Sequence, residues 1–164
     1  MNKDAIFEAT KRRMLEWYGS QRSYGRCLYW MHAGIVSLAE HGIESVPAAG
    51  SAEWRTPTAR WAFEWEGKDT PDRVIPKGYD PRKALPEMHC WILTRDGYFV
   101  DFSLCELNAT IKAITDEEWT EIEVPSYLWC PVHAMPPGFI YQPSMAATKL
   151  AVATIVNAAQ EQET

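Results

Sequence analysis

The sequence lacks the features of a nucleic-acid-binding or membrane protein. Lys and Arg number 16 against 22 Asp and Glu, which gives a formal net charge of −6, and only residues 11–13 form a basic run. A surface that neutralises phosphates needs a basic face, so we expect no nucleic-acid partner. No apolar run could cross a bilayer, and charges early in the chain argue against a signal peptide. We therefore expect a cytoplasmic protein with no membrane partner.

Cysteine is also scarce, at four residues with irregular spacing. In a cytoplasmic chain these cysteines should be reduced, which leaves each as a core residue, a metal ligand or a nucleophile. No phosphate-binding glycine loop is visible, and we expect no cofactor and no metal. The 164 residues with 46% apolar content are enough for one core. We expect a single domain over residues 1–164.

Helices are predicted at both ends of the chain. Residues 1–20 contain an amphipathic N-terminal helix that ends at Gly19, and residues 144–160 a C-terminal helix that Ser144 can cap. Residues 67–87 contain four prolines and no regular period. We expect a loop there, and such loops often act as lids or binding loops. A tolerated insertion is the alternative.

A third helix is predicted to begin at Cys27. From Cys27 to about His41, apolar residues recur at three- and four-residue spacing, and Gly42 provides the left-handed residue that often ends a helix. Ile43 could then pack back on the helix. Cys27 is therefore expected in the first turn.

Strand-like patterns lie in five parts of the remaining chain. Alternating or β-rich runs lie at residues 61–65, 88–94, 98–104, 124–129 and 139–141. The second and third of these runs flank a short Arg-Asp-Gly turn. They predict a β-hairpin.

The turn of this hairpin admits two registers. A two-residue Asp96-Gly97 turn would pair Asp101 with Ile92 and place a carboxylate on the apolar face. A three-residue loop with Gly97 left-handed instead pairs Ile92 with Val100 and leaves that face wholly apolar. Because a slip of one residue moves every side chain to the other face, we predict the three-residue loop.

The same register puts His89 and Asp101 on the opposite face as diagonal neighbours. Such diagonals lie roughly 7–8 Å apart, a span that a histidine and an aspartate can bridge with a hydrogen bond. The carboxylate then fixes the imidazole tautomer and leaves its other nitrogen free to act as a base. A thiol at a helix start beside an imidazolium ionises readily. Cys27, His89 and Asp101 are therefore our candidate nucleophile, base and orienting carboxylate.

In order and context these residues resemble the transglutaminase-like branch of the papain-like cysteine enzymes. The matching motifs are Gly25-Arg26-Cys27, Gly42-Ile43, Ala49-Gly50, His89-Cys90-Trp91 and the run from Asp96 to Asp101. They span residues 25–103, about half the chain. The resemblance implies an α+β fold in which the nucleophile helix packs on an antiparallel sheet, and a triad in the order Cys, His, Asp.

The resemblance also suggests residues that would contact a substrate. Gln21 lies six residues before Cys27, the spacing at which papain-like proteases carry an oxyanion-hole glutamine; a surface glutamine is the alternative. Aromatic side chains often line ligand sites. The candidates here are Tyr24, Trp30 and Trp91.

Acyl transfer through a thioester on Cys27 is the chemistry that the resemblance implies. Water as the acceptor would make the protein a thiol hydrolase, such as a peptidase or amidase, and an amine would make it a transglutaminase or an N-acyltransferase. No motif for a second substrate is visible, which favours hydrolysis of a peptide, a protein or a small amide or ester. The oligomeric state stays open.

Two other classes compete with the enzyme. One is a structural zinc protein, with Cys90, Cys105, Cys130 and His133 as ligands, although their spacing is poor. The other is a binding module that has kept the fold and lost the chemistry.

Overall fold

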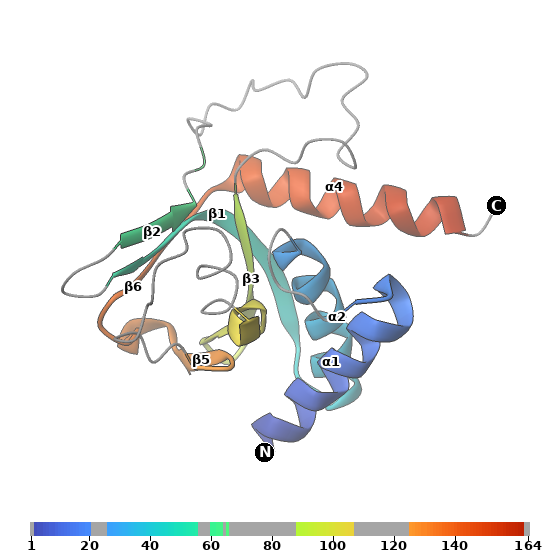
Figure 1. Ribbon diagram of the computed structural model, residues 1–164, viewed down its shortest axis with the longest axis horizontal. Coiled ribbons are helices and arrows are strands. Elements are labelled where there is room, and N and C mark those ends of the chain that lie inside the picture. Colours follow the sequence, from blue (N-terminus) through green and yellow to red (C-terminus); the bar gives the residue numbers. More distant parts are fainter. Residues whose placement is uncertain are drawn as a thin grey trace. The chain divides into compact units, whose positions relative to one another are not determined.

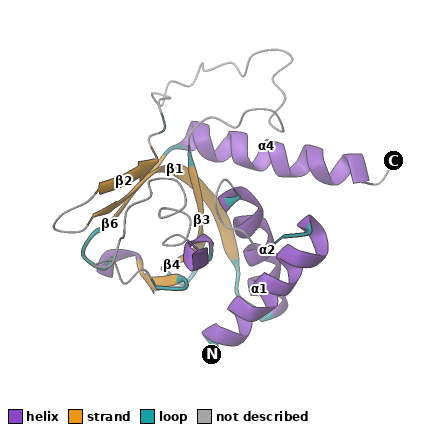
Figure 2. Ribbon diagram, in the orientation of Figure 1, coloured by secondary structure: helices purple, strands orange, loops and turns teal. Residues whose placement is uncertain are grey.

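The chain folds into helices and an antiparallel sheet, as the computed structural model in Figures 1 and 2 shows. The structure describes residues 2–20, 26–55, 60–63, 65, 88–106 and 125–162. The strand order is β2-β1-β3-β4-β5, and β6 also pairs with β1. The predicted α+β class is confirmed. No helix in the described ranges is both long and apolar enough to span a membrane.

By their internal contacts, the residues group into two compact units. The first consists of Met1–Pro47 and Trp91–Pro136, and the second of Ala48–Cys90 and Pro137–Thr164. Two strands, β1 (Ser45–Arg55) and β3 (His89–Thr94), begin in one unit and end in the other. The predicted loop at residues 67–87 lies outside the described residues.

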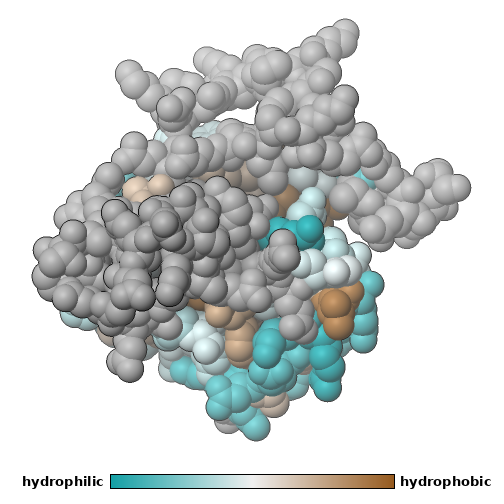
Figure 3. Space-filling view, in the orientation of Figure 1, coloured by the Kyte–Doolittle hydropathy of each residue, from teal (hydrophilic) through white to brown (hydrophobic). Residues whose placement is uncertain are grey.

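In the first unit, α1 (Lys3–Tyr18) and α2 (Cys27–Glu40) form an antiparallel pair. Asn2 caps α1 by accepting the Ala5 amide at 3.1 Å. Gly19 ends the helix in the left-handed conformation, with φ +64°, as predicted. In Figure 3 the visible surface over α1 is mainly hydrophilic. That face belongs to a helix that keeps its charged residues in water.

The end of α2 is a Schellman motif. Gly42, with φ +72°, donates its N–H to the Ala39 carbonyl at 2.9 Å, and Ile43 donates to the Leu38 carbonyl at 3.0 Å. These two bonds satisfy carbonyls that the helix itself leaves without donors. The predicted start at Cys27 and stop at Gly42 are both confirmed.

The hairpin of β3 and β4 (Tyr98–Asp101) adopts the predicted register. Ile92 pairs with Val100, Leu93 pairs with Phe99, and Gly97 has φ +87°. The three-residue loop is therefore confirmed. β4 also pairs antiparallel with β5 (Leu128–Pro131), and a short 3-10 turn (Ser103–Glu106) follows β4.

The core of the first unit lies between α2 and the apolar face of this hairpin. Ile92, Val100 and Phe102 are each at most 2% exposed. α2 approaches the hairpin closely at Gly34, because a Cβ there would lie 2.7 Å from both the Ile92 Cδ1 and the Phe102 Cδ2 atoms. Within this unit α2 therefore packs on the hairpin.

The second unit is built on β1, β2 (Arg60–Phe63), β6 (Phe139–Pro143) and α4 (Met145–Gln162). β1 pairs antiparallel with both β2 and β6. The Ser144 hydroxyl accepts the Ala147 amide at 3.2 Å, so the predicted cap of the last helix is confirmed. Thr148 of α4 accepts the Ala49 amide of β1 at 2.9 Å.

Strand β1 was not predicted from the sequence. Its middle consists of Pro47, Ala48, Ala49 and Gly50, which are residues of low strand propensity. The structure explains this composition at Gly50, where a Cβ would lie 2.1 Å from the Gln142 carbonyl oxygen. The close approach of β6, rather than a side-chain pattern, determines this part of the strand.

Candidate active site

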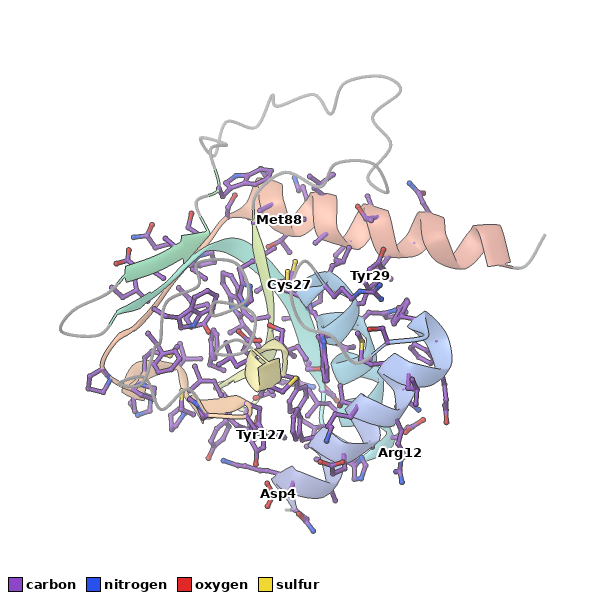
Figure 4. The ribbon with its side chains drawn as sticks, in the orientation of Figure 1. Asp4, Arg12, Cys27, Tyr29, Met88 and Tyr127 are labelled. Atoms are coloured by element: carbon purple, nitrogen blue, oxygen red, sulfur yellow. The ribbon has the colours of Figure 1, made fainter. Side chains whose placement is uncertain are left out.

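Cys27 is the first residue of α2, and it is partly exposed (Figure 4). Arg26 precedes it as the N-cap residue, and its carbonyl accepts the amides of Tyr29 and Trp30 at 2.9 and 3.1 Å. The Cys27 and Leu28 amides stand at the positive end of the helix dipole. A thiolate or an oxyanion would be stabilised at this end.

Asp101 ends β4 and is 1% exposed. Its Oδ1 atom accepts two hydrogen bonds from Ser103, one from the amide at 2.9 Å and one from the hydroxyl at 2.6 Å. Both donors come from a residue two positions along the chain, so they hold the carboxylate in one orientation. The sequence analysis missed Ser103, although a serine two residues after an aspartate is a recurrent local motif.

His89 begins β3 and belongs to the second unit, where it is 3% exposed. Its ring meets the Trp54 ring edge to face, with centroids 5.1 Å apart and an interplanar angle of 89°. The Tyr141 ring lies 5.9 Å away at 45°. Sequence reasoning missed both aromatic residues, because their strands pair only in the folded sheet.

The three candidate catalytic residues are thus described in two units, with Cys27 and Asp101 in the first and His89 in the second. β3 continues from His89 into the first unit, and its register with β4 is the one from which His89 and Asp101 are predicted to be diagonal. The register is confirmed. The meeting of the three side chains stays a prediction.

Of the residues predicted to contact a substrate, the structure describes only the two tryptophans. Trp30 is 1% exposed and stacks with Phe7 at 6.2 Å, so it lies in the core. Trp91 is 2% exposed and stacks with Phe99 at 5.9 Å. Gln21 and Tyr24 lie outside the described residues.

The remaining cysteines have ordinary surroundings. Cys90 is 1% exposed, as expected for the apolar face of the hairpin. Burial raises the pKa of the Cys130 thiol, which lies 3.9 Å from the Met135 sulfur. Among the residues that the structure describes, no three His, Cys, Asp or Glu side chains gather as metal ligands would. The zinc alternative therefore gains no support from the positions of Cys90, Cys105, Cys130 and His133.

A second histidine lies on α2. His32 Nδ1 is 2.6 Å from the Tyr18 hydroxyl, and the Trp17 ring is 5.2 Å from the His32 ring. Burial lowers the pKa of His32, and the nearby Arg13 lowers it further. Burial also raises the pKa of Tyr18 to about 12, with a further contribution from Tyr29. The pair is therefore neutral near pH 7.

A groove of about 680 Å³ lies near the opposite end of α2 from Cys27. Ile35 and Ala39 of α2, Ile43 and Val46 contribute to its lining. The helix has 14 residues, and at about 1.5 Å per residue its two ends are roughly 20 Å apart. This hollow is therefore separate from Cys27.

Comparison with known proteins identifies the fold and no more. No family model matches the sequence, and neither does any curated protein. A solved structure described only as a genomics crystal structure is similar, with a TM-score of 0.59 and 17% sequence identity over 95% of this chain and 71% of that chain. At that identity the likeness supports the α+β architecture that the two chains share.

Proposed function

We propose that this protein is a cysteine-dependent acyl-transfer enzyme, a thiol hydrolase of the peptidase or amidase type. Cys27 is the nucleophile, His89 the general base and Asp101 the carboxylate that orients His89. The observation that carries the proposal is the β3–β4 register: apolar alternation alone predicts it, and the same register would put His89 and Asp101 on one face of the hairpin. The helix start at Cys27 supports it independently.

The reaction has two halves. His89 takes the proton from the Cys27 Sγ atom, and the thiolate attacks the carbonyl carbon of the substrate, forming an S–C bond. The C–N or C–O bond of the substrate breaks, and the imidazolium returns its proton to the departing amine or alcohol. Water then attacks the thioester with His89 again as base, the S–C bond breaks, and the carboxylic acid product leaves.

Electrostatic support for these steps would come from two places. The Cys27 amide at the helix start can donate to the oxyanion of the tetrahedral intermediate. Ser103 holds Oδ1 of Asp101, and in this proposal Oδ2 accepts the N–H of His89. A carboxylate fixed in this way selects one imidazole tautomer and stabilises the imidazolium.

The burial of His89 and Asp101 also supports a catalytic role for them. His89 is 3% exposed and Asp101 is 1% exposed. Buried ionisable groups cost free energy unless they are paired and hydrogen-bonded, and such groups concentrate at functional sites. A binding module without chemistry has no need of a buried histidine and a buried aspartate at diagonal strand positions.

The proposal places the chain in the papain-like superfamily, in its transglutaminase-like branch. The substrate is a peptide, a protein or a small amide or ester. Transfer to an amine, as in a transglutaminase or an N-acyltransferase, is the alternative outcome with the same triad. The two are separated by whether an added amine is incorporated into the product.

Selective alkylation tests the nucleophile. An ordinary thiol with a pKa near 8.5 is only about 0.3% ionised at pH 6, so a Cys27 activated by His89 should react with iodoacetamide far faster than the other thiols. Cys105, which is also partly exposed but does not open an α-helix, is the matched control. Peptide mass spectrometry measures both rates. Equal rates for Cys27 and Cys105 at pH 6 would contradict the proposal.

Trapping identifies the acyl donor. The enzyme is mixed with a panel of activated amides and esters, and the Cys27 adduct is identified by its mass. Cys27→Ala should form no adduct, while Cys105→Ala should form it normally. An adduct that forms equally well in Cys27→Ala would exclude Cys27 as the nucleophile.

A further inference from the structure

Trp54 and Tyr141 form a hydrogen-bonded aromatic pair in the second unit. Trp54 lies on β1 and Tyr141 on β6, and the register that pairs Trp54 with Phe139 makes Tyr141 its diagonal neighbour on the same face. The indole N–H of Trp54 donates to the Tyr141 hydroxyl at 3.2 Å. The two rings are nearly perpendicular, at 85° and 6.2 Å. This bond fixes each ring relative to the other.

His89 contacts both members of this pair. It meets the Trp54 ring at 5.1 Å and 89°, and the Tyr141 ring at 5.9 Å and 45°. Two differently inclined rings restrict rotation of the imidazole about its side-chain bonds. Trp54 is only 3% exposed, so its ring is itself held by its surroundings.

We propose that Trp54 and Tyr141 are positioning residues that clamp the His89 ring in the orientation needed for proton transfer. The inference rests on the proposed function, in which His89 is the general base. A general base must lie within hydrogen-bonding reach of the proton that it takes, and a misplacement of about 1 Å can lower the rate roughly 10²-fold.

Tyr141→Phe is the most informative variant, because it removes the hydroxyl that binds the indole and keeps both rings. Tyr127→Phe is its matched control. The Tyr127 hydroxyl donates to Asp4 at 2.7 Å in the first unit, so this control loses one tyrosine hydrogen bond that is not part of the clamp. Trp54→Phe, which removes the N–H donor and part of the ring, provides a second and stronger perturbation.

The first readout is nitrogen NMR of the histidine rings, which reports tautomer and ring exchange without any turnover. The chain has only four histidines, and His89→Gln assigns the signals of His89. We expect one tautomer in the natural protein, and exchange broadening or two tautomers in Tyr141→Phe and Trp54→Phe. Tyr127→Phe should match the natural protein.

The second readout is the rate of Cys27 alkylation as a function of pH. We expect Tyr141→Phe to lower this rate on the order of tenfold at pH 6 and to move the midpoint of its pH profile, while Tyr127→Phe leaves both unchanged. His89 signals and a pH profile that are unaltered in both Tyr141→Phe and Trp54→Phe would overturn the clamp. If Cys27 is unreactive in the natural protein, the proposed function fails, and the NMR readout still decides whether Trp54 and Tyr141 fix His89.

Discussion

Asp101→Asn tests the candidate triad most directly, because the structure indicates that the fold should survive it. The Oδ1 atom of Asp101 accepts two hydrogen bonds from Ser103, and the amide oxygen of an asparagine can accept both. The substitution changes the other terminal atom of the side chain: the amide NH₂ of asparagine replaces Oδ2, which in the proposal accepts the N–H of His89. The variant should therefore fold and present the wrong partner to the imidazole.

The expected effect on turnover is large. The equivalent change in serine-protease triads lowers kcat about 10⁴-fold because it imposes the wrong tautomer, and we expect a loss of roughly 10²- to 10⁴-fold here. His89→Ala combined with Asp101→Asn should lose little more than the worse single variant, since members of one catalytic unit are non-additive. The assay is turnover of the acyl donor found by trapping.

Ser103→Ala is the control for stability. It removes one of two hydrogen bonds to a charged group, a loss of about 1.5–3 kcal/mol. In a domain of this size that corresponds to a fall in Tm of roughly 3–12 °C. Asp101→Asn should lower Tm by less than Ser103→Ala and lower turnover by far more. A fully active Asp101→Asn enzyme would refute the assignment of Asp101 to the triad.

Three further predictions follow from the described contacts. Cys27→Ala should abolish acyl-enzyme formation at an unchanged Tm, whereas Cys90→Ala, at a buried position, should cost about 1 kcal/mol of stability by chemical denaturation and keep activity; the reverse pattern would exchange their roles. Gly34→Ala should destabilise the protein by about 1–3 kcal/mol through overpacking against Ile92. The roughly 1 kcal/mol by which alanine is favoured over glycine in a helix offsets part of this loss. An unchanged midpoint of unfolding in urea would contradict the prediction. Because the pKa of His32 is lowered in the folded state, the folded protein binds fewer protons than the unfolded chain as pH falls below about 6.5, the ordinary pKa of histidine. Stability from this group is therefore present above that pH and lost below it, so Tm should fall more steeply from pH 7 to pH 5 in the natural protein than in His32→Gln, and equal slopes would exclude His32 as the cause.

Local signals in the sequence predicted the elements that carry Cys27 and Asp101. Helix α2 ends where Gly42 adopts a positive φ, and its start at Cys27 was predicted from the turn-forming residue types that precede it in the sequence. The hairpin register followed from apolar alternation combined with a three-residue loop at Gly97. The boundaries of α2 and the register of the hairpin each depend on a few neighbouring residues with few allowed backbone conformations. Such local features can be predicted from the sequence.

Long-range packing could not be predicted in the same way. Trp30 was expected at a cleft and is in the core, because the face of α2 that meets Phe7 depends on where α1 lies. Trp54 and Tyr141 meet His89 only through the folded sheet. Their strands are far apart in the chain, and nothing in one strand specifies its partner.

Gly50 has a consequence for how this protein can vary among relatives. Its backbone approaches the Gln142 carbonyl so closely that no side chain fits between them, at the junction of the two strands that carry Trp54 and Tyr141. Contacts between side chains can be retained through paired substitutions, in which one residue grows as the other shrinks. At Gly50 only a hydrogen atom meets the backbone carbonyl of Gln142, so no change of side chain at position 142 can make room for a larger residue at position 50. Coupled variation between positions 50 and 142 should therefore be missing from an alignment of relatives, and this strand pairing would have to be recognised from a glycine that does not change.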